Sequence, residues 1–441
     1  MYEGTGALQG RATGSTAAAS AWLLPLVILL FFAWGFCTVL VDTLIPKLKA
    51  VFSLNYTEAM LTQFCFFLAY FVASIPAGQL IGRIGYLRGI VVGLVVMAGG
   101  CLLFTPAAAM GWYPAFLGAL FILACGITVV QVAANPLAAG LGDPARSHSR
   151  LTLAQAFNSV GTMLGPMFGA ALILSGGAEA TAPSQLSGAA LEAFRREEAH
   201  DLRLPFMIIA AVLAALALMC WIVRRAQVPA VHVPRGGDYL RLLRHPRLSL
   251  GALAIFLYVG AEVTVGSLMA NFLMQEDTLH ASAKAAGVMI SIYWGLAMVG
   301  RFIGSYVLRF LAPGVVLTVC AVMAALLAVT AALSGGMTAA VAILAIGLFN
   351  SVMFPTIFAL SIDGLGEDTA GGSGLLCQAI VGGAIVPLLA GFTADRIGLA
   401  LALLVPAACY VWIAVYGLLV RKGSLRDRRE DGVAVVSSPL H

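Results

Sequence analysis

The sequence predicts an all-α membrane protein whose twelve transmembrane helices form two pseudo-symmetric halves of six. Composition is the first reason: 61% of the 441 residues are hydrophobic and only 10% are charged, whereas soluble proteins carry roughly 25% charged residues. The second is a series of apolar runs long enough to cross a bilayer, and the third is that patterns of the first half return in the second. So much apolar surface needs lipid as its solvent.

Twelve apolar runs approach or exceed the roughly 20 residues that a helix needs to cross the hydrocarbon core. The first run is too long for a signal-peptide core and lacks a clear cleavage site, so we expect a retained helix. The predicted spans are 22–44, 60–82, 89–108, 112–140, 151–175, 204–224, 248–273, 285–309, 313–334, 338–362, 371–394 and 398–421.

A basic, proline-bearing loop divides these spans into six plus six. We predict that this loop, 225–247, is a cytoplasmic linker between an N-terminal half, 22–224, and a C-terminal half, 248–421. Residues 1–21 are expected to be a disordered cytoplasmic tail, and 422–441 a second cytoplasmic tail. With both termini in the cytoplasm, 18 of the 25 Lys and Arg residues lie on the cytoplasmic side, as the positive-inside rule favours.

Several classes of function are disfavoured by what the sequence contains. The eight cysteines stand alone in apolar stretches, which is typical of small core residues rather than disulfides or metal ligands. No Walker A string, HExxH, GxSxG or acidic metal cluster occurs, so we expect neither an enzyme nor a cofactor, and no nucleic-acid partner. The Arg-, Ala- and Gly-rich composition favours a bacterial inner-membrane protein, which we expect to be a monomer.

Two pairs of similar segments support the division into halves. PAGQLIGRIGYLRG (76–89) and GLAMVGRFIGSYVLRF (295–310) both place Gly-Arg at a predicted cytoplasmic helix end. VQVAANPLAAGLGD (130–143) and MFPTIFALSIDGLGED (353–368) both place a proline in a helix that leads to a Leu-Gly-acid turn. Two such halves around a cavity near the bilayer midplane are a common plan of secondary transporters.

One acid lies inside the first predicted span, and another lies in the span that opens the second half. Asp42 is the only formal charge in 22–44, and burying a carboxylate in hydrocarbon costs about 3 kcal/mol. With Glu262 in the matching span, it predicts ion-coupled transport, and both acids are candidate coupling groups. The alternative for Asp42 is a place near the outer interface, where its side chain reaches water.

The coupling ion is either a proton or sodium. A proton needs one titratable group, whereas sodium needs several oxygen ligands. Asp42 together with Thr38 could supply part of such a sodium site. The sequence leaves both ions open.

A loop rich in glycine and arginine follows the second predicted span. The segment GQLIGRIGYLR (78–88) resembles the cytoplasmic loop signature of the major facilitator superfamily, G-x-L-x-D/G-R-x-G-x-R/K. Glycines allow close helix approach, and arginines can reach acids or helix C-termini. A generic positive-inside loop is the alternative. The resemblance and its repeat imply a gating role for Gly78, Arg83, Gly85, Arg88 and Arg301.

Longer strings resemble the fucose permease branch of that superfamily, over about residues 25–420. The resemblance implies the major facilitator fold and the import of a monosaccharide with a cation by alternating access. The strings that carry it are DTLIP (42–46), AANP (133–136), LTLAQAFNS (151–159), YVGAE (258–262) and FPTIF (354–358).

Two positions depart from the L-fucose/proton symporters of this branch. Where these have a glutamate in span four, this chain has Gln131, and where they have an amide in span seven, it has Glu262. The exchange resembles the glucose/galactose sub-branch. Glucose, galactose, mannose, fucose and N-acetylglucosamine all remain possible substrates.

Side-chain amides supply the candidate sugar site of the N-terminal half. Each sugar hydroxyl both donates and accepts a hydrogen bond, so its recognition needs amides and acids. Gln131 and Asn135 share one face of span four, and Gln155 and Asn158 share one face of span five. Hydrogen bonding between helices is the alternative. Asn135 precedes a proline, which favours a helix-kink role.

The C-terminal half offers an acid, amides and aromatic rings, whose faces can cover the apolar surface of a sugar. Tyr258 lies one turn before Glu262, so its hydroxyl is within reach of the carboxylate. Packing or an interfacial belt is the alternative for the aromatic residues. The candidates in this half are Tyr258, Glu262, Asn271, Trp294, Phe354 and Gln378, followed by Tyr293 and Asn350.

Two other functions stay open. An exporter of small molecules from the same superfamily would need a larger apolar cavity, and the amides argue against it. A non-transporting membrane sugar sensor would bind its ligand but show no flux.

Overall fold

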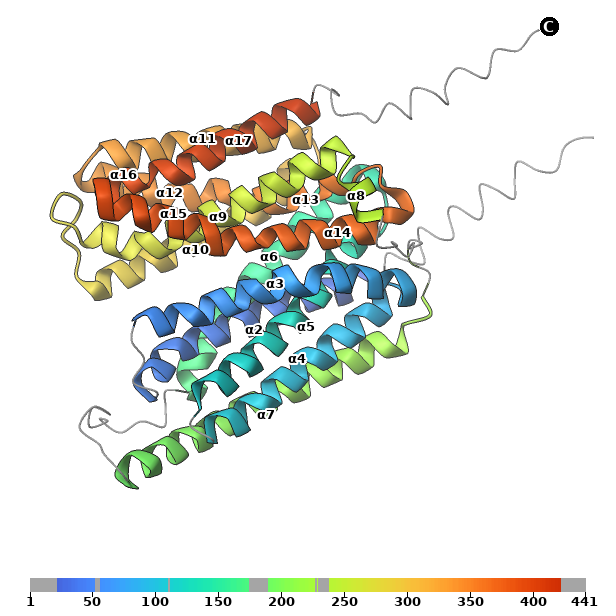
Figure 1. Cartoon of the computed structure of the whole chain (residues 1–441). Helices are drawn as coiled ribbons and strands as arrows, with labels where there is room; N and C mark the ends of the chain where they lie inside the picture. The colour runs from blue at the N-terminus through green and yellow to red at the C-terminus, as the bar shows by residue number, and fades with distance from the viewer. Residues whose placement is uncertain are drawn as a thin grey trace, which may run out of the picture. The chain divides into compact units, whose positions relative to one another are not determined.

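Helices make up the regular secondary structure of the described part of the chain. The structure is a computed structural model that describes residues 22–51, 56–109, 112–173, 189–226, 228 and 238–421. These residues contain no strand. The helices belong to two compact units, Met1–Val233 and Pro234–His441 (Figure 1). The predicted all-α class is confirmed.

The described part of the N-terminal unit contains six long helices, one for each span predicted in this half. Each of them contains at least one proline within its range, among them Pro76, Pro106 and Pro136. Membrane helices tolerate such prolines because neighbouring helices can satisfy the freed backbone groups. The six helices are α2 (Leu24–Val51), α3 (Tyr56–Ile84), α4 (Tyr86–Ala109), α5 (Tyr113–Gly140), α6 (Ser147–Ile173) and α7 (Ala189–Ile222).

Helices α4 and α5 approach each other at glycines. A Cβ atom added to Gly126 would lie 2.6 Å from the backbone nitrogen of Met97 and 2.8 Å from the carbonyl oxygen of Gly93. Both distances are shorter than ordinary contact, so any side chain here would force the two backbones apart. The glycines therefore allow the close crossing of these helices.

The turn between α5 and α6 is closed by one arginine. The Nη1 and Nη2 groups of Arg150 donate to the carbonyls of Asp143 and Ala139, each at 2.5 Å. These are charge-assisted bonds to carbonyls at and just after the C-terminal end of α5, where intrahelical donors run out. Helices α5 and α6, which carry the candidate amides, are joined by this contact.

The described part of the C-terminal unit also contains a helix or a group of two or three helices for each of its six predicted spans. Three spans consist of more than one helix. The elements are α8 (Asp238–Leu242), α9 (Pro246–Met274), α10 (Ala283–Val307), α11 (Pro313–Leu333), α12 (Gly336–Asn350), α13 (Met353–Ile362), η3 (Gly366–Asp368), α14 (Thr369–Gln378), η4 (Ala379–Val381), α15 (Gly382–Ile397), α16 (Leu399–Ala402) and α17 (Leu404–Arg421).

The break between α12 and α13 has a local cause. Pro355 lacks an N–H group, and its ring crowds the carbonyl of the residue four positions earlier, which is Ser351. Helix α12 accordingly ends at Asn350, and α13 begins at Met353. The sequence predicted one uninterrupted helix over 338–362.

Two boundaries differ from those expected. Helix α7 begins at Ala189, although the predicted span starts at 204, because the helix continues through charged residues that hydropathy does not count. The segment predicted as a linker, 225–247, contains α8 and the start of α9. Arg241 on α8 pairs with Asp368 at 2.9 Å. In the described residues, nine helices or helix groups are long and apolar enough to span a membrane.

One end of α9 is tied to α13 and α17. Arg247 Nη1 lies 3.2 Å from Asp363 Oδ2, and the Asp363 side chain is 65% exposed. Beneath this pair, the hydroxyls of Tyr416 and Ser361 are 2.9 Å apart and buried. Tyr416 also donates to the backbone carbonyl of Arg247 at 3.2 Å.

Candidate functional site

A buried polar network surrounds Glu262 in the C-terminal unit. The hydroxyl of Tyr258 donates to Glu262 Oε1 at 2.7 Å, as the spacing of one helical turn predicts. The same hydroxyl lies 3.1 Å from the carbonyl oxygen of Asn350. Tyr258 has a single proton to donate, and the shorter contact, to the carboxyl group of Glu262, is the stronger one.

Arg301 supplies the positive charge of this network. Its Nη2 atom lies 3.8 Å from Glu262 Oε1, and the two side chains are only 12% and 16% exposed. Its Nε atom donates to the carbonyl of Ser351 at 3.2 Å. Arg301 was assigned to a gate by analogy with the first half, and the structure adds a direct contact with Glu262. Its gating role stays a prediction.

The break in the tenth span creates acceptors for this network. Pro355 leaves the Ser351 carbonyl without its usual intrahelical donor, and Arg301 fills that role. The carbonyl of Asn350, at the end of α12, faces the Tyr258 hydroxyl. A helix interruption deep in an apolar unit is tolerated where polar groups satisfy it.

Two residues named only as further candidates belong to the same network. The side-chain amide of Asn350 donates to Tyr293 Oη at 3.0 Å, and both side chains are buried. The network therefore joins α9, α10 and the end of α12. Its members are Tyr258, Glu262, Tyr293, Arg301 and Asn350, which we call the Glu262 network.

In the N-terminal unit the predicted amides bridge helices. Gln131 on α5 donates through Nε2 to the hydroxyl of Tyr70 on α3 at 2.7 Å. Asn158 on α6 donates through Nδ2 to the carbonyl of Phe31 on α2 at 2.9 Å. Each amide side chain is 9% exposed. Tyr70 was missed, and its only signal is a hydroxyl inside the apolar run FFLAYF.

A second amide pair lies between α5 and α6. Gln155 Nε2 donates to Asn135 Oδ1 at 3.4 Å, and both residues are buried. The Nδ2 group of Asn135 has no hydrogen-bond partner among the described residues, although the residue is fully buried. This amide group therefore has an unused donor beside the predicted polar face.

The other predicted substrate contacts lie at the edges of the C-terminal network or apart from it. Trp294 packs edge-on against Tyr293 with ring centroids 5.1 Å apart, and its side chain is 43% exposed. Phe354 is half-buried, and its ring centroid lies 6.3 Å from that of Tyr258. Asn271 is exposed near the end of α9.

Gln378 ends α14, immediately before η4. Gln378 is half-buried. Like Asn350, it lies where a membrane span changes from one helix to the next.

The predicted ion site lies on α2. Asp42 is part of this helix, but its side chain falls outside the described residues. Thr38 uses its hydroxyl proton to bond the carbonyl of Trp34 at 2.8 Å. The hydroxyl oxygen keeps lone pairs that could face a cation, so the sodium site at these two residues stays a prediction.

The predicted gate lies where α3 meets α4. Gly85 has a φ of +85°, a left-handed conformation that residues other than glycine rarely adopt. Gly78 is buried, whereas Arg83 and Arg88 are exposed. The backbone conformation at this turn therefore explains the glycine at position 85, and the gating role of all four residues stays a prediction.

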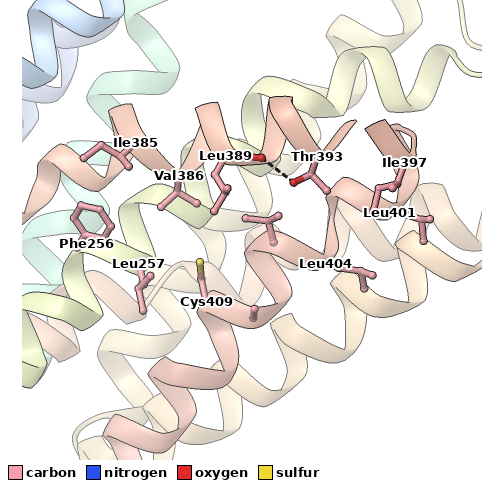
Figure 2. Close-up of a pocket in the computed structure, with 12 residues that line it drawn as sticks. Phe256, Leu257, Ile385, Val386, Leu389, Thr393, Ile397, Leu401, Leu404 and Cys409 are labelled. Carbon is pink, nitrogen blue, oxygen red and sulfur yellow. Dashed lines mark hydrogen bonds between the residues drawn. The ribbon is translucent and has the colours of Figure 1, made fainter. Parts of the chain in front are cut away.

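The C-terminal unit contains an apolar pocket of about 500 Å³, and Figure 2 shows the residues that line it. Phe256 and Leu257 of α9 line it together with residues of α15, α16 and α17, including Ile385 and Leu404. The hydroxyl of Thr393, which lines the pocket, already donates to the carbonyl of Leu389 at 2.8 Å. A sugar would lose its hydrogen bonds to water here without replacement, so this pocket is a poor sugar site.

Comparison with known proteins identifies the family. The model of the Major Facilitator Superfamily matches residues 23–379. The glucose/galactose transporter of Brucella abortus (strain 9-941) is 51% identical over 398 residues, which cover 89% of this chain and 93% of that protein. The L-fucose-proton symporter of Escherichia coli (strain K12) is 34% identical over 416 residues, covering 90% and 93%.

A solved structure agrees with these sequence matches. The crystal structure of the transporter FucP in the outward conformation has a TM-score of 0.85 and 33% sequence identity to this chain. The match covers 91% of this chain and 99% of that one. This multi-pass membrane protein has the predicted fold and belongs to the major facilitator superfamily.

Proposed function

We propose that this chain imports a monosaccharide together with a cation by alternating access. The observation that carries the proposal is the Glu262 network, in which an acid, an amide and two tyrosines are buried in an apolar unit. Such side chains match sugar hydroxyls, which both donate and accept. Relatives named as a glucose/galactose transporter and an L-fucose-proton symporter support the same substrate class.

The amides of the N-terminal unit and the Glu262 network are the proposed sugar contacts. Gln131 and Asn158 already hold partners in the structure, so a sugar would extend these networks rather than meet isolated groups. Glucose or galactose is the favoured substrate, because the relative with 51% identity carries that name. The full set of proposed contacts is Gln131, Gln155, Asn158, Tyr258, Glu262, Asn271, Trp294, Phe354 and Gln378.

Coupling is assigned to Asp42, with Glu262 as the second candidate. In this mechanism the outward-open carrier takes up the ion at Asp42 and then the sugar, and the loaded carrier turns inward. A charged carboxylate resists enclosure in a dry interior, so the ion must neutralise it first. A proton is favoured over sodium, because a relative is named as a proton symporter.

The energetics suffice for accumulation. One charge that crosses roughly 150 mV releases about 3.5 kcal/mol. Since each 1.4 kcal/mol is a factor of ten, this sustains a sugar gradient of about 300-fold. We place the chain in the bacterial inner membrane as a monomer with both termini in the cytoplasm.

Uptake in proteoliposomes tests this function. Radiolabelled glucose, galactose, mannose, fucose and N-acetylglucosamine are offered under an imposed proton gradient and, separately, a sodium gradient. We expect uphill uptake of one or two of these sugars under one gradient. An exporter would move them outward, and a sensor would bind them without any flux.

Asp42→Asn tests the coupling site. We expect this variant to keep sugar counterflow but to lose accumulation, because its amide cannot release and rebind a proton. Glu276→Gln is the matched control, since Glu276 is an exposed acid beyond the end of α9. Undiminished accumulation by Asp42→Asn would exclude Asp42 as the coupling group.

A further inference from the structure

The two candidate coupling acids differ in what the structure places beside them. Glu262 has a guanidinium at 3.8 Å and a tyrosine hydroxyl at 2.7 Å. We propose that Arg301 holds Glu262 as a permanent carboxylate, so that Glu262 is a fixed acceptor for a sugar hydroxyl and does not carry the coupling ion. This inference rests on the proposed function and assigns Arg301 as a positioning residue.

The charge of the pair is balanced without any added ion. An arginine stays protonated throughout the physiological pH range. A carboxylate beside it forms a neutral pair, so enclosing the pair does not require a proton or sodium. Breaking such a pair leaves one buried charge uncompensated, which is strongly unfavourable. Glu262 therefore gains nothing from cycling its proton during transport.

The ionisable groups around Glu262 in the described part of the C-terminal unit come from three helices. Among the described residues, Arg301 is the charged group that faces it, from α10. The other ionisable groups close to it are tyrosines: Tyr258 on α9, Tyr293 on α10 and Tyr410 on α17. Tyrosine hydroxyls are neutral donors at physiological pH, so Arg301 is the charge that acts on Glu262 within the described part of the chain.

Arg301 is also fixed in place independently of Glu262. Its Nε atom donates to the Ser351 carbonyl, which has no intrahelical donor because Pro355 lacks an N–H group. The guanidinium is thus anchored between α10 and the α12–α13 break. An anchored guanidinium orients the carboxylate before the ligand arrives, which lowers the entropic cost of binding.

The geometry selects a ligand hydroxyl as the partner of Glu262. Both described contacts, from Tyr258 and Arg301, converge on Oε1. The second carboxylate oxygen, Oε2, is the one offered to a ligand, and the side chain is 16% exposed. A carboxylate accepts hydrogen bonds and donates none, so it selects donors such as the hydroxyls of a hexose.

Glu262→Gln separates the two roles of the acid. We measure the KM for D-galactose and D-glucose and the accumulation ratio at saturating sugar, in proteoliposomes under the same imposed gradient. The KM is expected to rise about tenfold to a hundredfold, as for loss of a charged hydrogen bond, with an accumulation ratio within twofold of the wild type. A variant that exchanges sugar but no longer accumulates it would overturn the inference.

The arginine is tested by rescue and by a double variant. Arg301→Met should raise the KM as Glu262→Gln does, and Arg301→Lys should restore part of the affinity by keeping the charge. In the double variant Glu262→Gln/Arg301→Met, the two increases in KM should not multiply. Its melting temperature should exceed that of Arg301→Met, because no buried charge is left unpaired. Arg309→Met, in the same unit just beyond α10, is the matched control. An unchanged KM in Arg301→Met, or effects that multiply, would refute the positioning role.

The outcomes distinguish this inference from the proposed function. No flux of any sugar by the wild-type protein would contradict the function itself. Uphill uptake by the wild type, combined with loss of coupling in Glu262→Gln, would contradict only the inference.

Discussion

The amide of Gln131 on α5 donates to the hydroxyl of Tyr70 on α3, with 2.7 Å between Nε2 and Oη. The contact joins two helices, and both side chains are buried. Tyr70 fixes the orientation of the Gln131 amide, which is a proposed sugar contact. This pair therefore links helix packing to substrate recognition.

We predict that Tyr70→Phe raises the KM for the transported hexose several-fold and lowers the melting temperature. The substitution leaves the buried Gln131 amide without its described acceptor, which costs about 1–3 kcal/mol. Transport kinetics in proteoliposomes and thermal denaturation in detergent measure the two effects. Tyr306→Phe is the control, because Tyr306 is 62% exposed. Equal behaviour of the two variants would contradict a structural role of the Tyr70 hydroxyl.

The contacts at one end of α9 predict that losing a buried hydroxyl costs more stability than losing an exposed ion pair. Asp363→Asn removes an exposed ion pair with Arg247, and such pairs contribute about 0–1 kcal/mol. Tyr416→Phe removes a buried hydroxyl that contacts Ser361 and a backbone carbonyl, and it should cost about 1–3 kcal/mol.

We therefore expect Tyr416→Phe to lower the melting temperature more than Asp363→Asn does. The effect of Asp363→Asn should also shrink at high salt, since exposed charges are screened. Thermal denaturation at two salt concentrations measures both. A larger loss from Asp363→Asn at either salt would contradict this ranking.

The apolar pocket of Figure 2 should not take part in sugar binding. Ala408→Leu adds volume to its lining, and we expect the KM for the transported hexose to stay within about twofold of the wild type. The reason is that the lining is almost wholly apolar, so it cannot replace the hydrogen bonds between a sugar and water. A tenfold rise in KM, measured beside a wild-type preparation of equal stability, would assign this pocket to the substrate path.

Hydropathy predicted the spans because each is a predominantly apolar run, which is a property of the local sequence. The contact between Tyr258 and Glu262 was also predictable, because residues four apart share one face of a helix. The interruption at Asn350 had a local signal in Pro355, because a proline breaks a helix about one turn before its own position. Hydropathy does not register this effect, so it merged α12 and α13 into one span.

Contacts between helices could not be predicted in this way. Arg301 and Glu262 lie on different helices, and which faces meet depends on the packing of the whole unit. The repeat of Gly-Arg in the two halves indicated a gate for Arg301, but it carried no information about a buried carboxylate nearby. Tyr70 was missed for the same reason, since nothing in its own span marks Gln131 as its partner.

Two glycines on the same helix give the sharpest test of the packing. Gly126 faces the α4 backbone, where an added Cβ would lie 2.6 Å from the nitrogen of Met97. Gly118 has no atom within 4 Å of its added Cβ. We predict that Gly126→Ala destabilises the protein by about 1–3 kcal/mol through overpacking, while Gly118→Ala is neutral or stabilises it slightly through helix propensity.

Thermal denaturation in detergent compares the two variants directly, and transport assays show whether the crossing also matters for function. Because both substitutions add the same methyl group to the same helix, a difference between them reports the α4–α5 contact rather than propensity. If Gly126→Ala were as stable as Gly118→Ala, the two backbones could not be as close as the crossing at Gly93 requires.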